Sequence, residues 1–159
     1  MLLTIDVGNT NTVIGLFDGE RLANSYRIKT DPHGTADETA LVFRGLLAND
    51  EPVTGICLCS TVPAVLREMR TMLNRYYSDI PTVIVEPGIK TGVGVLTDNP
   101  KEVGTDRIVN TLAAYALYGG PSIVVDFGTS TNFDVVTKNG EFPAGGLAAG
   151  IESSAEGLD

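Results

Sequence analysis

The amino-acid sequence predicts an α/β fold: a lobe with a mixed five-stranded sheet, followed by the beginning of a second, similar lobe. Three observations support this prediction. β-rich and helix-rich segments alternate along the 159 residues, turn signals separate them, and a strand–turn–strand pattern recurs after residue 120. Hydrophobic residues make up 43% of the chain and charged residues 19%, which supports a hydrophobic core and excludes disordered and low-complexity classes.

The first strands are expected to form antiparallel hairpins. Asp18-Gly19 separates two apolar runs and is typical of a two-residue hairpin turn. A turn-rich stretch, Asp6–Asn11, separates the first run from the second. The expected strands are Leu2–Ile5, Val13–Phe17 and Leu22–Ile28.

Two helices are expected to lead to two further strands, Val53–Cys59 and Thr82–Val85. Thr35-Ala36-Asp37-Glu38 has the form of a capping box and predicts the start of the first helix. Ser60 or Thr61 is expected to cap the second helix. Because strand–helix–strand crossovers make neighbouring strands parallel, these two strands should extend the same sheet in parallel.

A third helix and a second hairpin follow. Asn99-Pro100-Lys101-Glu102 predicts the start of a helix that continues to about Tyr118, before a Gly-Gly-Pro break. The strands Ser122–Val125 and Phe133–Thr137 are then expected, with an Asn139-Gly140 hairpin turn after them.

These elements predict a first lobe at residues 1–118 and a truncated second lobe at residues 121–159, which ends just after a helix opens at Gly150–Glu152. The second segment is too short to bury a core unaided. Asp134 is expected at the surface of its hairpin. The hairpin is expected to leave an uncovered apolar face that pairs with a second copy. That face is formed by Ile123, Val124, Val125, Phe133, Val135 and Val136.

The net charge of −9 limits the partners, because an acidic chain repels a nucleic-acid backbone; no nucleic acid is expected. Cys57 and Cys59 lie in one apolar run and are expected to be reduced core thiols, as in a cytoplasmic protein. With a single His33 and no Cys/His cluster, no transition-metal site is expected. The N-terminal residues match neither a signal peptide nor a membrane span.

One turn motif occurs twice at an offset of 120 residues. Asp6-x-Gly8-x-Thr10 matches Asp126-x-Gly128-x-Ser130, and each copy follows a strand. Glycine lets the backbone approach a ligand closely, amides and hydroxyls can surround phosphate oxygens, and the carboxylate can hold a cation. The repeat therefore predicts a site for the phosphates of a nucleotide. The sequence contains neither a P-loop nor a dinucleotide-binding fingerprint.

Three motifs in this order resemble the bacterial type III pantothenate kinases: Asp6–Thr12, Gly104–Arg107 and Asp126–Thr129. The resemblance covers essentially the whole chain. It implies ribonuclease-H-like lobes of the actin, sugar-kinase and Hsp70 superfamily and ATP-dependent phosphorylation of pantothenate, the first step of coenzyme A biosynthesis. It also implies Mg²⁺ with ATP, a monovalent cation (K⁺ or NH₄⁺) and a homodimer.

The resemblance also assigns roles to single residues. Asp106 is the expected general base, and Arg107 is expected to hold the carboxylate of pantothenate. Asp126 is the expected ligand of the monovalent cation, and Asp6 is a candidate Mg²⁺ ligand. The remaining substrate-site residues are Thr97, Gly104 and Thr105. The expected ATP-binding residues are Asp6, Val7, Gly8, Asn9, Thr10, Asn11, Thr12, Val13 and Thr129.

Three positions depart from the family pattern. Thr97 stands where some relatives carry an aromatic residue that contacts substrate, Asn132 where a threonine is usual, and Ala149 where a proline often precedes the glycine.

Several alternatives stay open. Asp106 and Arg107 could be an ordinary solvated pair at a helix start. The chain could also belong to another kinase or ATPase of the superfamily, or be a fragment that binds nucleotide or self-associates without turnover. We expect little kinase activity from these 159 residues by themselves.

Overall fold

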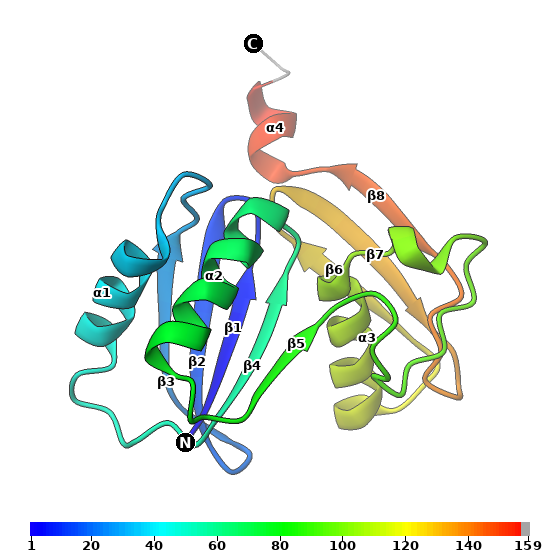
Figure 1. Ribbon diagram of the computed structural model, residues 1–159. Coiled ribbons are helices and arrows are strands. Elements are labelled where there is room, and N and C mark those ends of the chain that lie inside the picture. The colour runs from blue at the N-terminus through cyan, green and yellow to red at the C-terminus, as the bar shows by residue number, and fades with distance from the viewer. Residues whose placement is uncertain (157–159) are drawn as a thin grey trace. The chain divides into compact units, whose positions relative to one another are not determined.

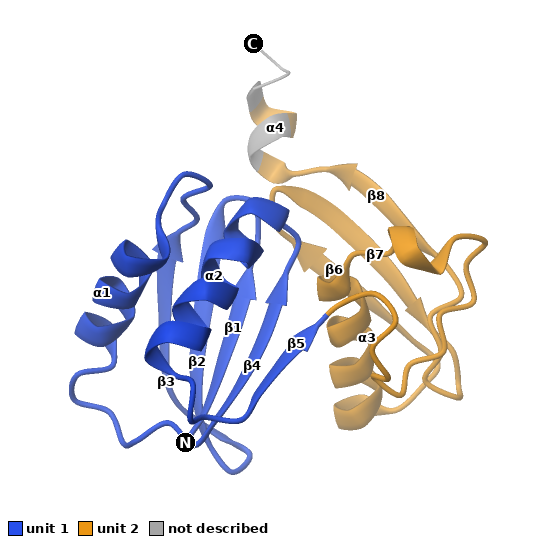
Figure 2. Ribbon diagram, viewed as in Figure 1, with its two compact units in different colours: residues 1–85 blue, residues 86–159 orange. Residues whose placement is uncertain are grey.

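The computed structural model describes residues 1–156 and divides the chain into two compact units, Met1–Val85 and Glu86–Asp159 (Figure 2). Each unit has its own sheet. In the part of the chain that the structure describes, no helix combines the length and apolar character that crossing a membrane requires.

The first unit contains the predicted mixed five-stranded sheet, with strand order β3-β2-β1-β4-β5 (Figure 1). β1 pairs with β2, and β2 with β3, in antiparallel fashion, whereas β4 and β5 extend the sheet in parallel. The predicted fold class and sheet are therefore confirmed. The bounds are β1 Leu2–Val7, β2 Asn11–Asp18, β3 Arg21–Lys29, β4 Gly55–Ser60 and β5 Thr82–Val85.

Two helices, α1 (Ala36–Leu46) and α2 (Pro63–Tyr76), cover one face of this sheet (Figure 1). Their buried apolar side chains form one cluster with those of β1, β2 and β4. Burial of these side chains is the main stabilising contribution to the unit. The fully buried members include Leu3, Ile14, Leu16, Phe43, Leu58 and Met72.

The predicted capping box at the start of α1 is confirmed. The Thr35 hydroxyl accepts a hydrogen bond from the Glu38 amide at 3.3 Å, and the Glu38 carboxylate accepts one from the Thr35 amide at 2.9 Å. The predicted cap of α2 was wrong, because the N-cap residue is Val62, which has no polar side chain. The Ser60 hydroxyl instead accepts from the Val62 amide at 3.1 Å and shapes the turn before the helix.

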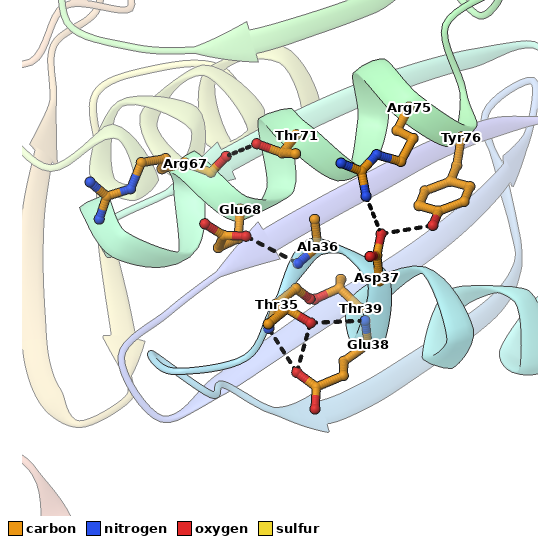
Figure 3. Close-up of polar contacts among 10 residues, drawn as sticks. All are labelled: Thr35, Ala36, Asp37, Glu38, Thr39, Arg67, Glu68, Thr71, Arg75 and Tyr76. Atoms are coloured by element: carbon orange, nitrogen blue, oxygen red, sulfur yellow. Dashed lines mark hydrogen bonds and ion pairs between the residues drawn. The ribbon is translucent and has the colours of Figure 1, made fainter.

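Polar contacts join the two helices beside their shared core (Figure 3). The Asp37 carboxylate in the first turn of α1 accepts from Arg75 Nη1 at 2.6 Å and from the Tyr76 hydroxyl at 2.7 Å. The Glu68 carboxylate of α2 accepts from the Ala36 amide at 3.1 Å, and so satisfies one of the amides left free at a helix start. These contacts fix the start of α1 against α2.

The second unit contains a three-stranded antiparallel sheet in the order β6-β7-β8. The strands are β6 Ser122–Phe127, β7 Ser130–Val136 and β8 Gly145–Ala149; β8 was not predicted. A short 3-10 helix, Pro100–Glu102, precedes α3 (Thr105–Tyr118), so the helix predicted from Asn99 is interrupted before Gly104. The expected helix after Gly150 is α4, Ile151–Glu156.

Helix α3 packs against β6 and β7. The compact units therefore divide the chain before α3, whereas the predicted lobes divide it after α3; the assignment of residues 1–118 and 121–159 to two lobes stays a prediction. A small core forms beneath α3 from Val103, Ile108 and Phe142.

One face of the β6–β8 sheet is apolar and exposed, as expected for the second hairpin. Ile123 and Phe127 of β6 are 67% and 69% exposed, and Leu147 of β8 is 68% exposed. Val124 and Val136 were wrongly placed on this face, because Val124 is the register partner of the buried Asp134 and the Val136 side chain is fully buried.

Candidate functional site

In both repeated turns, the amide of the glycine donates a backbone hydrogen bond to the carbonyl of the first residue of the next strand. In the first unit, residues 8–10 connect β1 to β2, and the Gly8 amide donates to the Asn11 carbonyl at 3.0 Å. In the second unit, residues 128–129 connect β6 to β7, and the Gly128 amide donates to the Ser130 carbonyl at 3.0 Å. The second connection is shorter, so Ser130 is the counterpart of Asn11 and not of Thr10 as the fixed offset suggested.

The first turn contains exposed residues, and the buried residues beside it hold its backbone in place. Asp6, Asn9 and Thr10 are exposed, whereas Val7 and Thr12 are buried. The hydroxyl of Thr12 lies 3.0 Å from that of Thr30, which in turn donates to the Gly8 carbonyl at 2.7 Å.

Among the candidate ATP-binding residues, Val7 and Thr12 therefore support the turn, while the exposed ones are accessible to a ligand. Gly8, Asn11 and Val13 are half-buried at its base.

The second turn is held by the backbone of the residue after β8. A Cβ on Gly150 would lie 2.2 Å from the Thr129 carbonyl oxygen and 3.0 Å from that of Gly128, so a side chain at this position would displace the turn. Thr129 itself is exposed. Of the departures from the family pattern, Asn132 is buried and accepts from the Ser130 hydroxyl at 3.2 Å, and the Ala149 carbonyl accepts from Thr131 at 3.3 Å.

The start of α3 positions the proposed base. Gly104 is the N-cap residue, and Thr105 is buried, so these two anchor the helix start. Asp106 follows in the first turn, where the Arg107 amide donates to its Oδ1 at 2.8 Å. Its side chain is only partly exposed.

The surroundings of Asp106 favour its protonated form. Burial raises the pKa of the Asp106 carboxyl, and the negative charges of Asp126 and Asp134 raise it further. The Arg107 amide and guanidinium act in the opposite direction. A carboxylate that binds a proton more readily than a free aspartate suits a general base. This environment disfavours the alternative of a solvated helix-start pair.

Arg107 forms an ion pair that the sequence did not predict. Its Nε donates to Asp134 Oδ1 at 2.7 Å, and its Nη2 lies 2.5 Å from the same oxygen. The guanidinium also lies over the Phe142 ring, 5.3 Å from its centroid. The Asp134 side chain is fully buried, so its expected surface position was wrong.

Asn110 is a further polar residue of this site. It lies one turn after Asp106 on α3, and its Nδ2 donates to Asp126 Oδ2 at 3.3 Å. Asp126, near the end of β6, is therefore connected to the helix that carries Asp106. The spacing of Asp106 and Asn110, four residues apart, was the signal that could have identified this residue.

The remaining candidate residues are less closely connected to this site. Thr97 is half-buried in the loop before the 3-10 helix, and among the described residues its hydroxyl has no hydrogen-bond partner. Among the side chains that the structure describes, no three from His, Cys, Asp or Glu gather in a way that could hold a metal. Asp126 thus offers one hard oxygen ligand, and a bound cation needs others from carbonyls, water or substrate.

Comparison with known proteins adds three findings. The family model described as type III pantothenate kinase matches residues 2–159. The chain is 65% identical to the type III pantothenate kinase of Salinispora arenicola over 159 residues and 64% identical to that of Frankia alni over 158 residues. In both cases 99% of this chain is covered but only 63% of the relative, so the chain spans less than two thirds of the length of these proteins.

A solved structure supports the fold. The ethanolamine utilization protein EutJ from Carboxydothermus hydrogenoformans matches 99% of this chain and 57% of its own, with a TM-score of 0.55 and 14% identity. At that identity the match concerns the fold and not the activity.

Proposed function

The chain belongs to the type III pantothenate kinase family, and from this membership we propose that the protein containing it transfers the γ-phosphoryl group of ATP to the primary hydroxyl of pantothenate. The single observation that carries the proposal is the half-buried Asp106 at the start of α3, with its raised pKa and its ordered neighbours. The product, phosphopantothenate, is the first intermediate on the route to coenzyme A.

Asp106 is the proposed general base. One carboxylate oxygen, Oδ1, is held by the Arg107 amide, which leaves Oδ2 to accept the proton of the substrate hydroxyl. The hydroxyl oxygen then forms its bond to the γ-phosphorus while the bond from that phosphorus to the bridging oxygen breaks and ADP leaves. Phosphoryl transfer needs mainly positioning and charge neutralisation, which agrees with a site of few catalytic groups.

Arg107 is proposed to hold the carboxylate of pantothenate. A guanidinium carries five N–H donors, and Asp134 engages only Nε and Nη2 through a single oxygen. The two donors of Nη1 are available for a charge-assisted hydrogen bond to substrate. Gly104, Thr105 and Thr97 complete the proposed substrate site.

ATP is proposed to bind as its Mg²⁺ complex, which neutralises phosphate charge. The candidate residues are Asp6–Val13 of the first unit, with Asp6 as the Mg²⁺ ligand, and Thr129 of the second. Asp126 is proposed to bind K⁺ or NH₄⁺; its carboxylate is partly exposed, accepts a hydrogen bond from Asn110 and supplies a negatively charged oxygen for a monovalent cation.

A homodimer is part of the same proposal. The exposed apolar face of β6–β8 is of the kind that associates with another surface. Sedimentation velocity of the 159-residue chain measures this directly: we expect an associated species, and a monodisperse monomer would contradict the proposal.

The proposed activity is tested by incubating the intact protein with Mg·ATP and pantothenate, other polyols or sugars, or no acceptor. Formation of phosphopantothenate, identified by mass and dependent on pantothenate, is the expected result. ATP hydrolysis without an acceptor, or phosphorylation of a sugar in preference to pantothenate, would favour another ATPase or kinase activity. Nucleotide binding with no turnover for any acceptor would favour a binding function.

A further inference from the structure

The guanidinium of Arg107 is enclosed by residues from three other segments of the second unit. Asp134 of β7 provides the negative charge, the Phe142 ring lies against its face, and Gly145 of β8 lies beside it. The enclosed side chain is only 15% exposed. Such burial of a charged group is favourable only with a well-placed partner of opposite charge.

Gly145 is the register partner of Asp134 in the sheet, and its missing side chain creates the space for Arg107. A Cβ at this position would lie 1.8 Å from Arg107 Nη2, 2.6 Å from Asp134 Oδ1 and 2.9 Å from the Phe133 carbonyl oxygen. The φ angle of Gly145 lies outside the left-handed region, so its backbone is open to any residue. Space, and not backbone conformation, therefore requires glycine here.

The neighbouring Gly146 provides the contrast. A Cβ on Gly146 would have no heavy atom of the described residues within 4 Å, and its φ angle also lies outside the left-handed region. The two adjacent glycines thus face opposite sides of the sheet, and only Gly145 lies against the ion pair.

We propose that Asp134 and Gly145 are positioning residues, which hold the Arg107 guanidinium in the one orientation that presents its remaining donors to the carboxylate of the substrate. This inference rests on the proposed function. Asp134 fixes Nε and Nη2 by charge, and Gly145 leaves the space that Nη2 needs. Neither residue contacts the substrate; both act through Arg107.

The pairing with Asp134 also affects the neighbouring base. Asp126, Asp134 and Arg107 are the charged groups that act on the Asp106 carboxyl, and the charge of Asp134 raises the pKa of that carboxyl. Replacing Asp134 by asparagine removes this contribution and should move the acid limb of the kcat/KM profile to lower pH. Gly145→Ala keeps the charge and so has no such direct effect, which separates the two variants.

The test compares Asp134→Asn and Gly145→Ala with the control Gly146→Ala in the intact protein. We expect KM for pantothenate to rise about 10- to 100-fold in the first two, the range for losing a hydrogen bond to a charged group, with KM for ATP unchanged. Gly146→Ala should match the parent. Equal effects on both KM values, or parental values for Gly145→Ala, would overturn the inference.

A second measurement is independent of turnover. The Nε–H proton of a buried, paired arginine exchanges slowly and gives a separate ¹⁵N–¹H signal, which Arg107→Lys assigns by its disappearance. We expect the signal in the parent and in Gly146→Ala, and its loss in Asp134→Asn and Gly145→Ala; retention in both would overturn the inference. A parent protein that does not phosphorylate pantothenate would overturn the proposed function, and this signal would then decide whether Asp134 and Gly145 hold Arg107.

If Asp134→Asn does not melt cooperatively, Gly145→Ala decides the question, because it removes no charge or hydrogen-bonding group. A Gly145→Ala protein that folds, binds ATP as the parent does and has lost affinity for pantothenate supports the inference. One that folds and binds pantothenate as the parent does overturns it.

Discussion

The two hairpins of the repeat, β1–β2 and β6–β7, have equivalent registers but opposite faces buried. Ile5 pairs with Ile14 in the first hairpin, and these side chains are 2% and 0% exposed. Their counterparts in the second hairpin, Val125 and Phe133, are also paired but are 44% and 43% exposed. The two hairpins therefore have similar strand sequences, but the helices that pack on each one determine which of its faces is buried.

The covering helices explain this difference. In the first unit, α1 and α2 cover the apolar face and the core contains no ion pair among its buried members. In the second unit, α3 packs on the sheet and brings Arg107 to the fully buried Asp134. The first hairpin thus forms a stable scaffold for an exposed turn, while the second builds charged groups into its interior, where a reaction can use them.

The largest expected effect in this comparison comes from replacing the proposed base, Asp106 of the second unit, by a neutral residue. Asp106→Asn in the intact protein should lower kcat about 10²- to 10⁴-fold, because an amide cannot accept the hydroxyl proton. Its fold should be retained, since the ionised Asp106 carboxylate is disfavoured in the folded state: a carboxyl whose pKa is raised on folding loses stability as pH rises through that range.

Steady-state kinetics and thermal melts measure these two effects. The matched control is Asp79→Asn, which changes an exposed acid of the first unit and should behave as the parent. Turnover within a few-fold of the parent in Asp106→Asn would exclude Asp106 as the base.

The second prediction compares equivalent core and surface positions. Ile14→Ala should lower the free energy of unfolding by about 2–5 kcal/mol, because it leaves a cavity beneath α1 and α2. Phe133→Ala, at the counterpart position, should cost about 1 kcal/mol or less at protein concentrations too low for self-association, because its side chain is half exposed in the single chain. Urea denaturation followed by circular dichroism at such concentrations measures both, and equal losses there would contradict the expected difference between the two faces.

The third prediction concerns the cation. Asp126→Asn removes the carboxylate that Asn110 holds at the end of β6. We expect the K⁺ or NH₄⁺ concentration for half-maximal activity to rise about tenfold, which corresponds to about 1.4 kcal/mol of lost binding. Titration of activity with KCl, at ionic strength held constant with a salt of a large organic cation, measures this. An unchanged salt dependence would show that the cation assignment is wrong.

The smallest expected effect lies at the start of α1, one of the two helices that cover the first hairpin. Thr35→Ala removes the hydroxyl of the capping box and should destabilise the chain by about 1 kcal/mol. Thr71→Ala in α2 is the control, since its hydroxyl only bonds back to the Arg67 carbonyl within the helix (Figure 3). If both variants lose the same stability by urea denaturation, the cap has no special role in holding α1 on the sheet.

Local patterns were sufficient to predict most of the first unit. Alternating apolar residues, the Asp18-Gly19 turn and the capping box at Thr35 are signals contained within a few residues, and the five-stranded sheet followed from them. Strand β8 escaped prediction because Gly-Gly-Leu-Ala-Ala has little intrinsic strand preference; its pairing with β7 makes it a strand.

The candidate site was predictable only in part. The turns and the Asp106-Arg107 pair are visible in the sequence, but the burial of Asp134 depends on an arginine 27 residues earlier in the chain. Asp134 was expected at the surface of its hairpin. The structure places Asp134 inward because Arg107 of α3 supplies its partner, which no local pattern can indicate.

The closeness of Gly145 to the Arg107–Asp134 pair constrains how this sequence can evolve. While Arg107 occupies its place, no residue with a side chain fits at position 145 without moving the guanidinium. Loss of the arginine would remove the closest of these contacts, while the Asp134 carboxylate and the Phe133 carbonyl oxygen would still limit the space at position 145. Among descendants of such a protein, a side chain at this position would mark lineages in which the Arg107–Asp134 pair has already been lost or rearranged.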